Sequence, residues 1–61
     1  MTLEKARQSI GMGVVYIPFP GCSKEQYEYG VITSVNDRFV FVRYGRDTIS
    51  KATRPDDLKL G

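Results

Sequence analysis

The sequence predicts a mainly β fold, a small barrel of five short strands preceded by a short N-terminal helix. Residues that favour strands, such as valine, isoleucine, tyrosine, phenylalanine and threonine, recur in short runs between residues 14 and 53. Glycine and proline separate these runs. The 61 residues suffice for only one domain, and a domain of this size buries about 60% of the surface that its unfolded chain exposes.

The first residues of the chain predict a short helix over residues 2–10. Thr2 can cap its N-terminus, Glu4 lies in the first turn where the helix dipole favours a carboxylate, and Gly11 ends it. Three apolar residues at helical spacing would face the same way: Leu3, Ala6 and Ile10. Because two turns are not stable alone, the helix must dock or fray. We therefore divide the chain into an N-terminal helical arm, residues 1–11, and a barrel, residues 12–61.

The first two strands are predicted at residues 14–17 and 27–35. Pro18 and Pro20 end the first strand, because proline cannot donate a hydrogen bond to a neighbouring strand. Residues 19–26 then form a loop that is long for such a small hairpin, and loops held on a rigid scaffold often carry function. Gly30, inside the second strand, indicates a bulge or a close approach of two backbones, which a small barrel needs where it bends.

The third strand is predicted at residues 38–44, after a tight turn at Asn36-Asp37. Both turn residues tolerate the left-handed backbone that a tight turn needs. Alternation places two valines on one face of the strand and two phenylalanines with an arginine on the other: Val40 and Val42, against Phe39, Phe41 and Arg43. Both faces are apolar in part, so alternation alone leaves open which of them is inward.

The last two strands are short. Residues 48–53 alternate and are mostly polar, with Ile49 as their one large apolar residue, which is typical of an edge strand that Lys51 protects from unwanted pairing. Residues 55–58 predict one helical turn, because proline is favoured at the first helical position. Leu58 would then enter the core, and Lys59-Leu60 would form the fifth strand.

Five short strands, a bent second strand and a helical turn before the last strand are typical of an SH3-like barrel. Over residues 13–60 the chain resembles Tudor-type domains, and more loosely KOW-type barrels. The matching residues are Gly30, Ile32, Val35, Val40, Val42, Tyr44, Gly45 and Asp57-Leu58. The resemblance implies that the two valines point inward and the two phenylalanines outward. It also implies an aromatic cage for a methylated cation, but the cage positions hold Pro18 or Phe19, Glu28 and Arg43 here.

The chain is also similar to short proteins encoded by bacteriophages and prophages. This similarity includes polar turn residues as well as the apolar spacing. The matching residues are Val15, Ile17-Pro18, Tyr27-Glu28, residues 30–37, residues 39–42, Ala52-Thr53 and residues 55–58. The resemblance implies a phage or prophage origin and no particular activity.

Composition excludes several classes of site. Cys22 is the one cysteine and there is no histidine, so an intramolecular disulfide, a Cys/His zinc site and a Ser–His or Cys–His catalytic pair are all excluded. We therefore expect no metal, no cofactor and no enzymatic activity. No signal-peptide pattern and no apolar run of membrane length is visible, so we expect no membrane association and a soluble, cytoplasmic protein.

The aromatic residues suggest a binding module that docks on a protein partner, such as a host or defence protein if the phage origin holds. Seven aromatic residues are more than a core of this size needs, and tyrosine and arginine are favoured at protein interfaces. The expected partner-binding residues are Phe19, Tyr27, Tyr29, Phe39, Phe41, Arg43 and Tyr44.

Two alternatives stay open. In a nucleic-acid-binding domain, aromatic rings would contact bases and five cations would contact phosphates: Arg38, Arg43, Arg46, Lys51 and Arg54. The net charge of +2 is low for this role. The remote alternative is an oligomeric enzyme like the plasmid dihydrofolate reductases. Residues 11–13, before the first strand, resemble the corresponding segment of that family, but the family's active-site run is replaced here by Thr48-Ile49-Ser50-Lys51. Self-association would enlarge the small core, so a homo-oligomer is compatible with each function.

Overall fold

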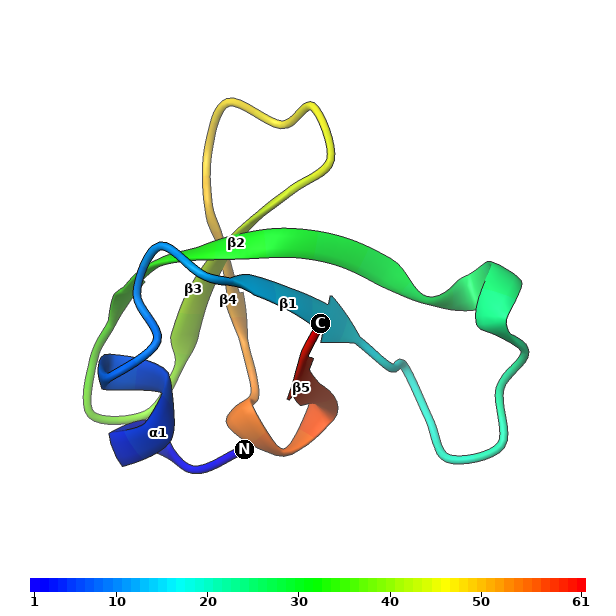
Figure 1. Ribbon diagram of the computed structural model, residues 1–61, viewed down its shortest axis with the longest axis horizontal. Coiled ribbons are helices and arrows are strands. Elements are labelled where there is room, and N and C mark those ends of the chain that lie inside the picture. The colour runs from blue at the N-terminus through cyan, green and yellow to red at the C-terminus, as the bar shows by residue number, and fades with distance from the viewer.

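The computed structural model describes residues 1–61 (Figure 1). In chain order its elements are α1 (Leu3–Arg7), β1 (Gly13–Tyr16), the 3-10 turn η1 (Lys24–Gln26), β2 (Glu28–Val35), β3 (Val40–Tyr44), β4 (Lys51–Thr53), the 3-10 turn η2 (Pro55–Asp57) and β5 (Leu58–Leu60). The predicted mainly β fold, with five strands and a short N-terminal helix, is confirmed. No helix in the chain is long and apolar enough to cross a bilayer.

The five strands form one antiparallel sheet in the order β4-β3-β2-β1-β5. The chain runs back and forth through the first four strands, and β5 then returns to pair with β1 on its free side. β4 is an edge strand, as its polar sequence predicts. The two edge strands, β4 and β5, do not pair with each other, so the sheet does not close into the complete barrel that the sequence predicts.

The β2–β3 hairpin is the centre of the sheet. A register shift between Ile32 and Ser34 leaves Thr33 as the extra residue of a β-bulge, which bends β2. The connecting loop differs from the predicted tight turn: no residue other than glycine has a positive φ. Instead, the Asn36 side-chain oxygen accepts hydrogen bonds from the backbone N–H groups of Arg38 and Phe39, at 2.8 and 2.6 Å. The side chain of asparagine therefore organises the loop, and the third strand begins two residues later than predicted.

Replacing Asn36 with alanine is expected to destabilise the domain by about 1–2 kcal/mol, because both backbone donors lose their acceptor. Asp37→Ala is the matched control. The neighbouring Asp37 side chain is fully exposed and makes only a 3.6 Å ion pair with Arg7, so its loss should leave the stability almost unchanged. Urea unfolding followed by circular dichroism measures both variants. Equal losses for the two variants would contradict this role of Asn36.

The core lies on the concave side of the sheet. The side chains that fill it are Ala6, Val14, Ile32, Val40, Val42, Tyr44 and Leu58. Val40 and Val42 point inward as the resemblance implies, and both are fully buried. Phe41 consequently lies on the opposite face, half-buried, and Phe39 is exposed in the loop before β3.

Helix α1 closes one side of this core by packing against β2. Thr2 caps it as predicted, accepting a hydrogen bond from the backbone N–H of Lys5. The helix ends at Arg7 rather than at residue 10. Of the three apolar residues predicted to face the same way, Ala6 is buried and Leu3 packs against the core, whereas Ile10 is exposed. The N-terminal ammonium of Met1 donates to two carbonyls of the last elements, Pro55 O at 2.7 Å and Leu58 O at 3.1 Å.

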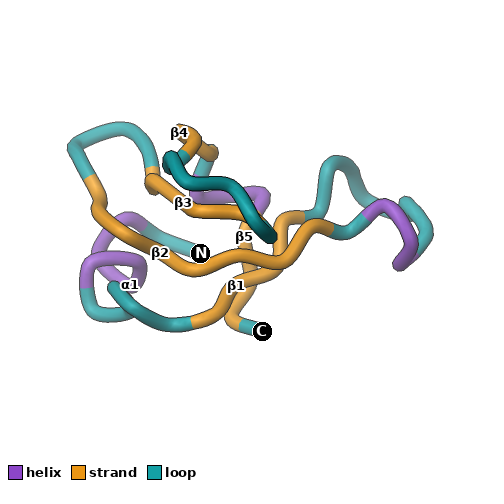
Figure 2. The backbone as a smooth tube through the Cα atoms, turned by 90° about the horizontal axis from the view of Figure 1, so that it is seen from above, coloured by secondary structure: helices purple, strands orange, loops and turns teal.

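Two loops extend beyond the sheet (Figures 1 and 2). The β1–β2 loop, which carries η1, runs furthest from the core. The β3–β4 loop replaces the first half of the predicted fourth strand: β4 begins at Lys51, and Ile49 is 70% exposed. Ser50 is held by a 2.6 Å hydrogen bond between its hydroxyl and that of Thr33, the bulge residue, rather than by a strand ladder.

Candidate binding groove

Two adjoining hollows form a groove between the beginning of β2, the end of β3, β4 and the η2 turn. The first hollow, of about 290 Å³, has Tyr16, Ala52, Thr53, Arg54 and Asp57 in its wall. The second, of about 390 Å³, has Tyr29, Gly45, Arg46 and Asp47. Glu28, Tyr44 and Lys51 line both hollows, so the hollows adjoin each other. Both are open to solvent and are large enough for one or two side chains of a ligand.

The floor of the first hollow is an aromatic pair. The rings of Tyr16 and Tyr44 meet edge to face, with centroids 6.1 Å apart and an angle of 66° between their planes. The Tyr44 and Thr53 hydroxyls lie 2.7 Å apart. The Thr53 hydroxyl also donates to the carbonyl oxygen of Lys51 at 3.3 Å. The hydrogen bond between Tyr44 and Thr53 connects the end of β3 to the edge strand β4 and holds the floor of the groove in place.

Tyr44, one of the expected partner-binding residues, lies at the base of the groove. Its ring is 8% exposed, because alternation along β3 puts it on the same inner face as Val40 and Val42. Burial raises the pKa of Tyr44 above its usual value of 10.0, while its hydrogen bond to Thr53 acts in the opposite direction. The negative charges of Glu28 and Asp57 add to the increase. Tyr44 is therefore a structural residue at the base of the groove.

The raised pKa of Tyr44 predicts a loss of stability at alkaline pH. The protonated Tyr44 side chain stabilises the folded protein fully at pH values below its pKa in the unfolded chain. This contribution disappears as the pH rises from about 10 through the higher pKa of the folded state. Tyr44→Phe should therefore be less stable than the parent by about 1 kcal/mol at pH 7, because one hydrogen bond is lost. This difference should shrink above pH 10. Urea unfolding of both proteins across this range is the measurement, and parallel curves would contradict the prediction.

The walls of the groove carry charges of both signs. Lys51 is held by Asp47, with 3.6 Å between the ammonium and a carboxylate oxygen. The side chains of Glu28, Arg54 and Asp57 make no ion pair or hydrogen bond. Unpaired groups of opposite sign beside aromatic rings suit a ligand that is itself charged and partly apolar.

The expected partner-binding residues do not form one surface. Phe41 and Arg43 lie on the convex outer face of the sheet, and Tyr29, 62% exposed, reaches the second hollow. Phe19 and Tyr27 belong to the β1–β2 loop, and Phe39 to the β2–β3 loop. Only Tyr29 and Tyr44 of this set are brought together at the groove.

The five cations of the alternative site are also divided. Arg46, Lys51 and Arg54 line the groove. Arg43 lies on the outer face, opposite Val31, and Arg38 lies in the β2–β3 loop. No continuous basic surface joins all five.

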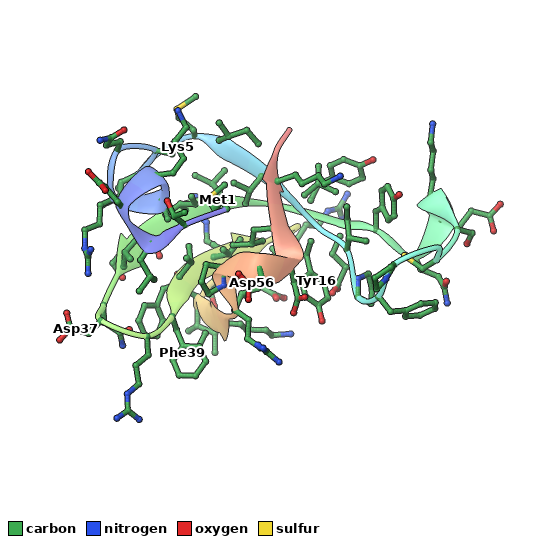
Figure 3. The ribbon with its side chains drawn as sticks, turned by 90° about the horizontal axis from the view of Figure 1, so that it is seen from below. Met1, Lys5, Tyr16, Asp37, Phe39 and Asp56 are labelled. Carbon is green, nitrogen blue, oxygen red and sulfur yellow. The ribbon has the colours of Figure 1, made fainter.

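Seven residues of the groove are missing from the expected sets: Tyr16, Glu28, Gly45, Asp47, Ala52, Thr53 and Asp57. Tyr16 and Asp57 are brought together because β1 pairs with β5, with the Ile17 N–H donating to the Asp57 carbonyl at 2.9 Å. Figure 3 shows Tyr16 beside the turn that carries Asp56. The short last strand predicted at Lys59-Leu60 could have indicated the contact between Tyr16 and Asp57, had its pairing with the first strand been predicted.

We compared the chain with protein-family models, with curated proteins and with solved structures, and found no match. The function of the protein is therefore inferred from the residues of the groove themselves.

Proposed function

We propose that this chain is a non-enzymatic binding module of SH3-like architecture, which docks on a protein partner by holding an extended segment of it in the groove. The bulge that bends β2, the single turn η2 before β5, and the return of β5 to β1 support the SH3-like assignment. The resemblance to phage and prophage proteins supports a partner from a bacterial host, in its cytoplasm.

The observation that carries the proposal is the position of the groove beside an unpaired sheet edge. β4 has β3 on one side and no strand on the other, and all three of its residues, Lys51, Ala52 and Thr53, line the first hollow. A peptide in an extended conformation can follow such an edge with its backbone while its side chains enter the neighbouring hollows. The two hollows adjoin each other, so alternate side chains of such a segment, which point to the same face, would enter them.

The proposal is tested by selecting binders from a random peptide library and measuring their affinity by fluorescence anisotropy. Glu28→Arg places a bulky side chain of opposite charge in the wall shared by the hollows, and should weaken the selected peptides at least about tenfold. Arg43→Glu is the matched charge reversal on the outer face and should change affinity by less than about twofold.

The outer face is the competing docking surface. If the double variant Phe41→Asp with Arg43→Glu abolished binding and Glu28→Arg had no effect, the partner would dock on the convex side of the sheet, and the groove would be excluded. Circular dichroism of each variant establishes that it is folded before its affinity is interpreted.

Nucleic-acid binding is the second candidate, because three cations lie along the groove: Arg46, Lys51 and Arg54. It ranks second because Glu28 and Asp57 stand among them and would repel phosphates, and because Lys51 is already held by Asp47. Sedimentation with mixed-sequence DNA and RNA at low and moderate salt separates the two. Co-sedimentation that falls steeply with salt would favour nucleic acid.

A further inference from the structure

The first hollow collects hydrogen-bond acceptors that have no donor. The carboxylates of Glu28 and Asp57 make no hydrogen bond or ion pair, and the Tyr16 hydroxyl makes no hydrogen bond. These groups come from three elements, β2, η2 and the end of β1, and line the same wall. The short side chain of Asp57 is partly buried, so its negative charge lies close to where the backbone places it.

The hollow also offers one aromatic ring rather than several. Tyr44 is buried and meets the Tyr16 ring edge to face, so Tyr16, which is only partly buried, presents the accessible ring surface. A quaternary ammonium binds best when several ring faces surround it. It has no N–H group, so it cannot donate to hydrogen-bond acceptors. A guanidinium stacks flat on one ring and donates hydrogen bonds in its own plane to carboxylates and hydroxyls.

We propose that this part of the groove, between Tyr16, Glu28 and Asp57, binds the guanidinium of an arginine in the partner's segment. The proposal rests on the function proposed above and names the side chain that enters the first hollow. The guanidinium would stack on Tyr16 and donate to the two carboxylates, whose charges it would neutralise.

Two cations also line this hollow and oppose an incoming one. The Lys51 ammonium is 3.6 Å from Asp47, which offsets part of its charge. Arg54 is exposed and long, so its charged end can turn toward water when a ligand enters. Removing the charge of Arg54 should therefore strengthen the binding of a cation and weaken the binding of an anion. The sign of this effect reports the charge of the ligand.

The experiment is a titration of the ¹⁵N-labelled protein with capped amino acids, followed by NMR chemical shifts. Nα-acetyl-arginine amide should saturate and shift Tyr16, Glu28 and Asp57. The corresponding derivatives of lysine and trimethyl-lysine should bind at least about fivefold more weakly, and the neutral citrulline derivative more weakly still. Equal binding of lysine and arginine would overturn the assignment of a guanidinium site.

Variants make the test specific. Glu28→Gln and Asp57→Asn should each weaken the arginine derivative about tenfold, since each removes a charged acceptor without changing shape. Asp56→Asn, in the same turn but outside the groove, is the matched control and should have no effect. Arg54→Ala should strengthen binding about twofold. Loss of binding in Arg54→Ala, with Asp57→Asn unchanged, would show an anion site and overturn the proposal.

The two proposals can fail separately. If the selected peptides bind the groove but contain no arginine, the guanidinium site is overturned and the docking function stands. If the arginine derivative binds as expected while no peptide from the library is sensitive to Glu28→Arg, the site stands as a side-chain pocket and the docking of an extended segment is overturned.

Discussion

Gly30→Ala is expected to unfold most of the protein under conditions where the parent is folded. A Cβ atom at this position would lie 2.6 Å from the Arg43 carbonyl oxygen and 2.6 Å from a methyl carbon of Val42. The first of these atoms is backbone of the neighbouring strand, which cannot move without separating β2 from β3. We expect a loss of about 3 kcal/mol or more, which is comparable to the whole stability of a domain of this size, roughly 3–5 kcal/mol.

The matched control is Gly13→Ala, at the start of β1. A Cβ there would meet only the Gly30 carbonyl oxygen, at 3.9 Å, which is an ordinary contact. Its stability should stay within about 1 kcal/mol of the parent. Circular dichroism, with trimethylamine oxide added to refold destabilised variants, gives both values on one scale. If Gly30→Ala were as stable as Gly13→Ala, this result would contradict the close approach of β2 and β3 at Gly30.

Leu58→Ala is expected to have the second large effect. Leu58 is fully buried at the beginning of β5 and is among the largest side chains of the core. Removing it leaves a cavity that the short flanking elements cannot fill, at a cost of about 3 kcal/mol. Leu60 is the same residue type in the same strand but is 41% exposed, so Leu60→Ala should cost less than about 1 kcal/mol.

Thermal and urea unfolding of the two leucine variants measure this contrast. A loss for Leu60→Ala equal to that for Leu58→Ala would mean that β5 sits in a different register on β1. The contrast is useful because the pairing of β5 with β1 also positions Asp57 against Tyr16, at the groove.

Local patterns predicted the parts of the fold that depend on neighbouring residues. The role of Gly30 as a close approach follows from a glycine inside a strand of β-branched residues. The burial of Leu58 follows from its place after a proline-initiated turn. The direction of Val40 and Val42 needed the resemblance as well, because both faces of β3 are apolar in part.

Errors arose where a tertiary contact overrides a local pattern. Residues 48–50 alternate like a strand, but Ser50 bonds to the bulge residue Thr33 and the ladder starts later. Ile10 has helical spacing, but the helix ends at Arg7, and the Gly11 N–H then donates to the Ile32 carbonyl of β2. Periodicity reveals neither contact, because it reports only which residues share a face.

The candidate site was the least predictable feature, for the same reason. Tyr16, Glu28 and Asp57 are separated by loops and meet only after β1 has paired with both β2 and β5. The burial of Tyr44 is the one feature of the site that the sequence could have predicted. It shares the alternation of Val40 and Val42, so the face that buries the valines also buries its ring.

The pairing of β1 with β5 sets the order in which the chain can fold. The β2–β3 hairpin closes a short loop, since Val35 pairs with Val40. The pairing of Val14 with Leu60 closes a much longer loop. Closing the longer loop costs more entropy and should come late. During synthesis on the ribosome, β1 therefore keeps an open edge until residues 58–60 have emerged. The Tyr16 side of the groove is completed only when β5 has paired.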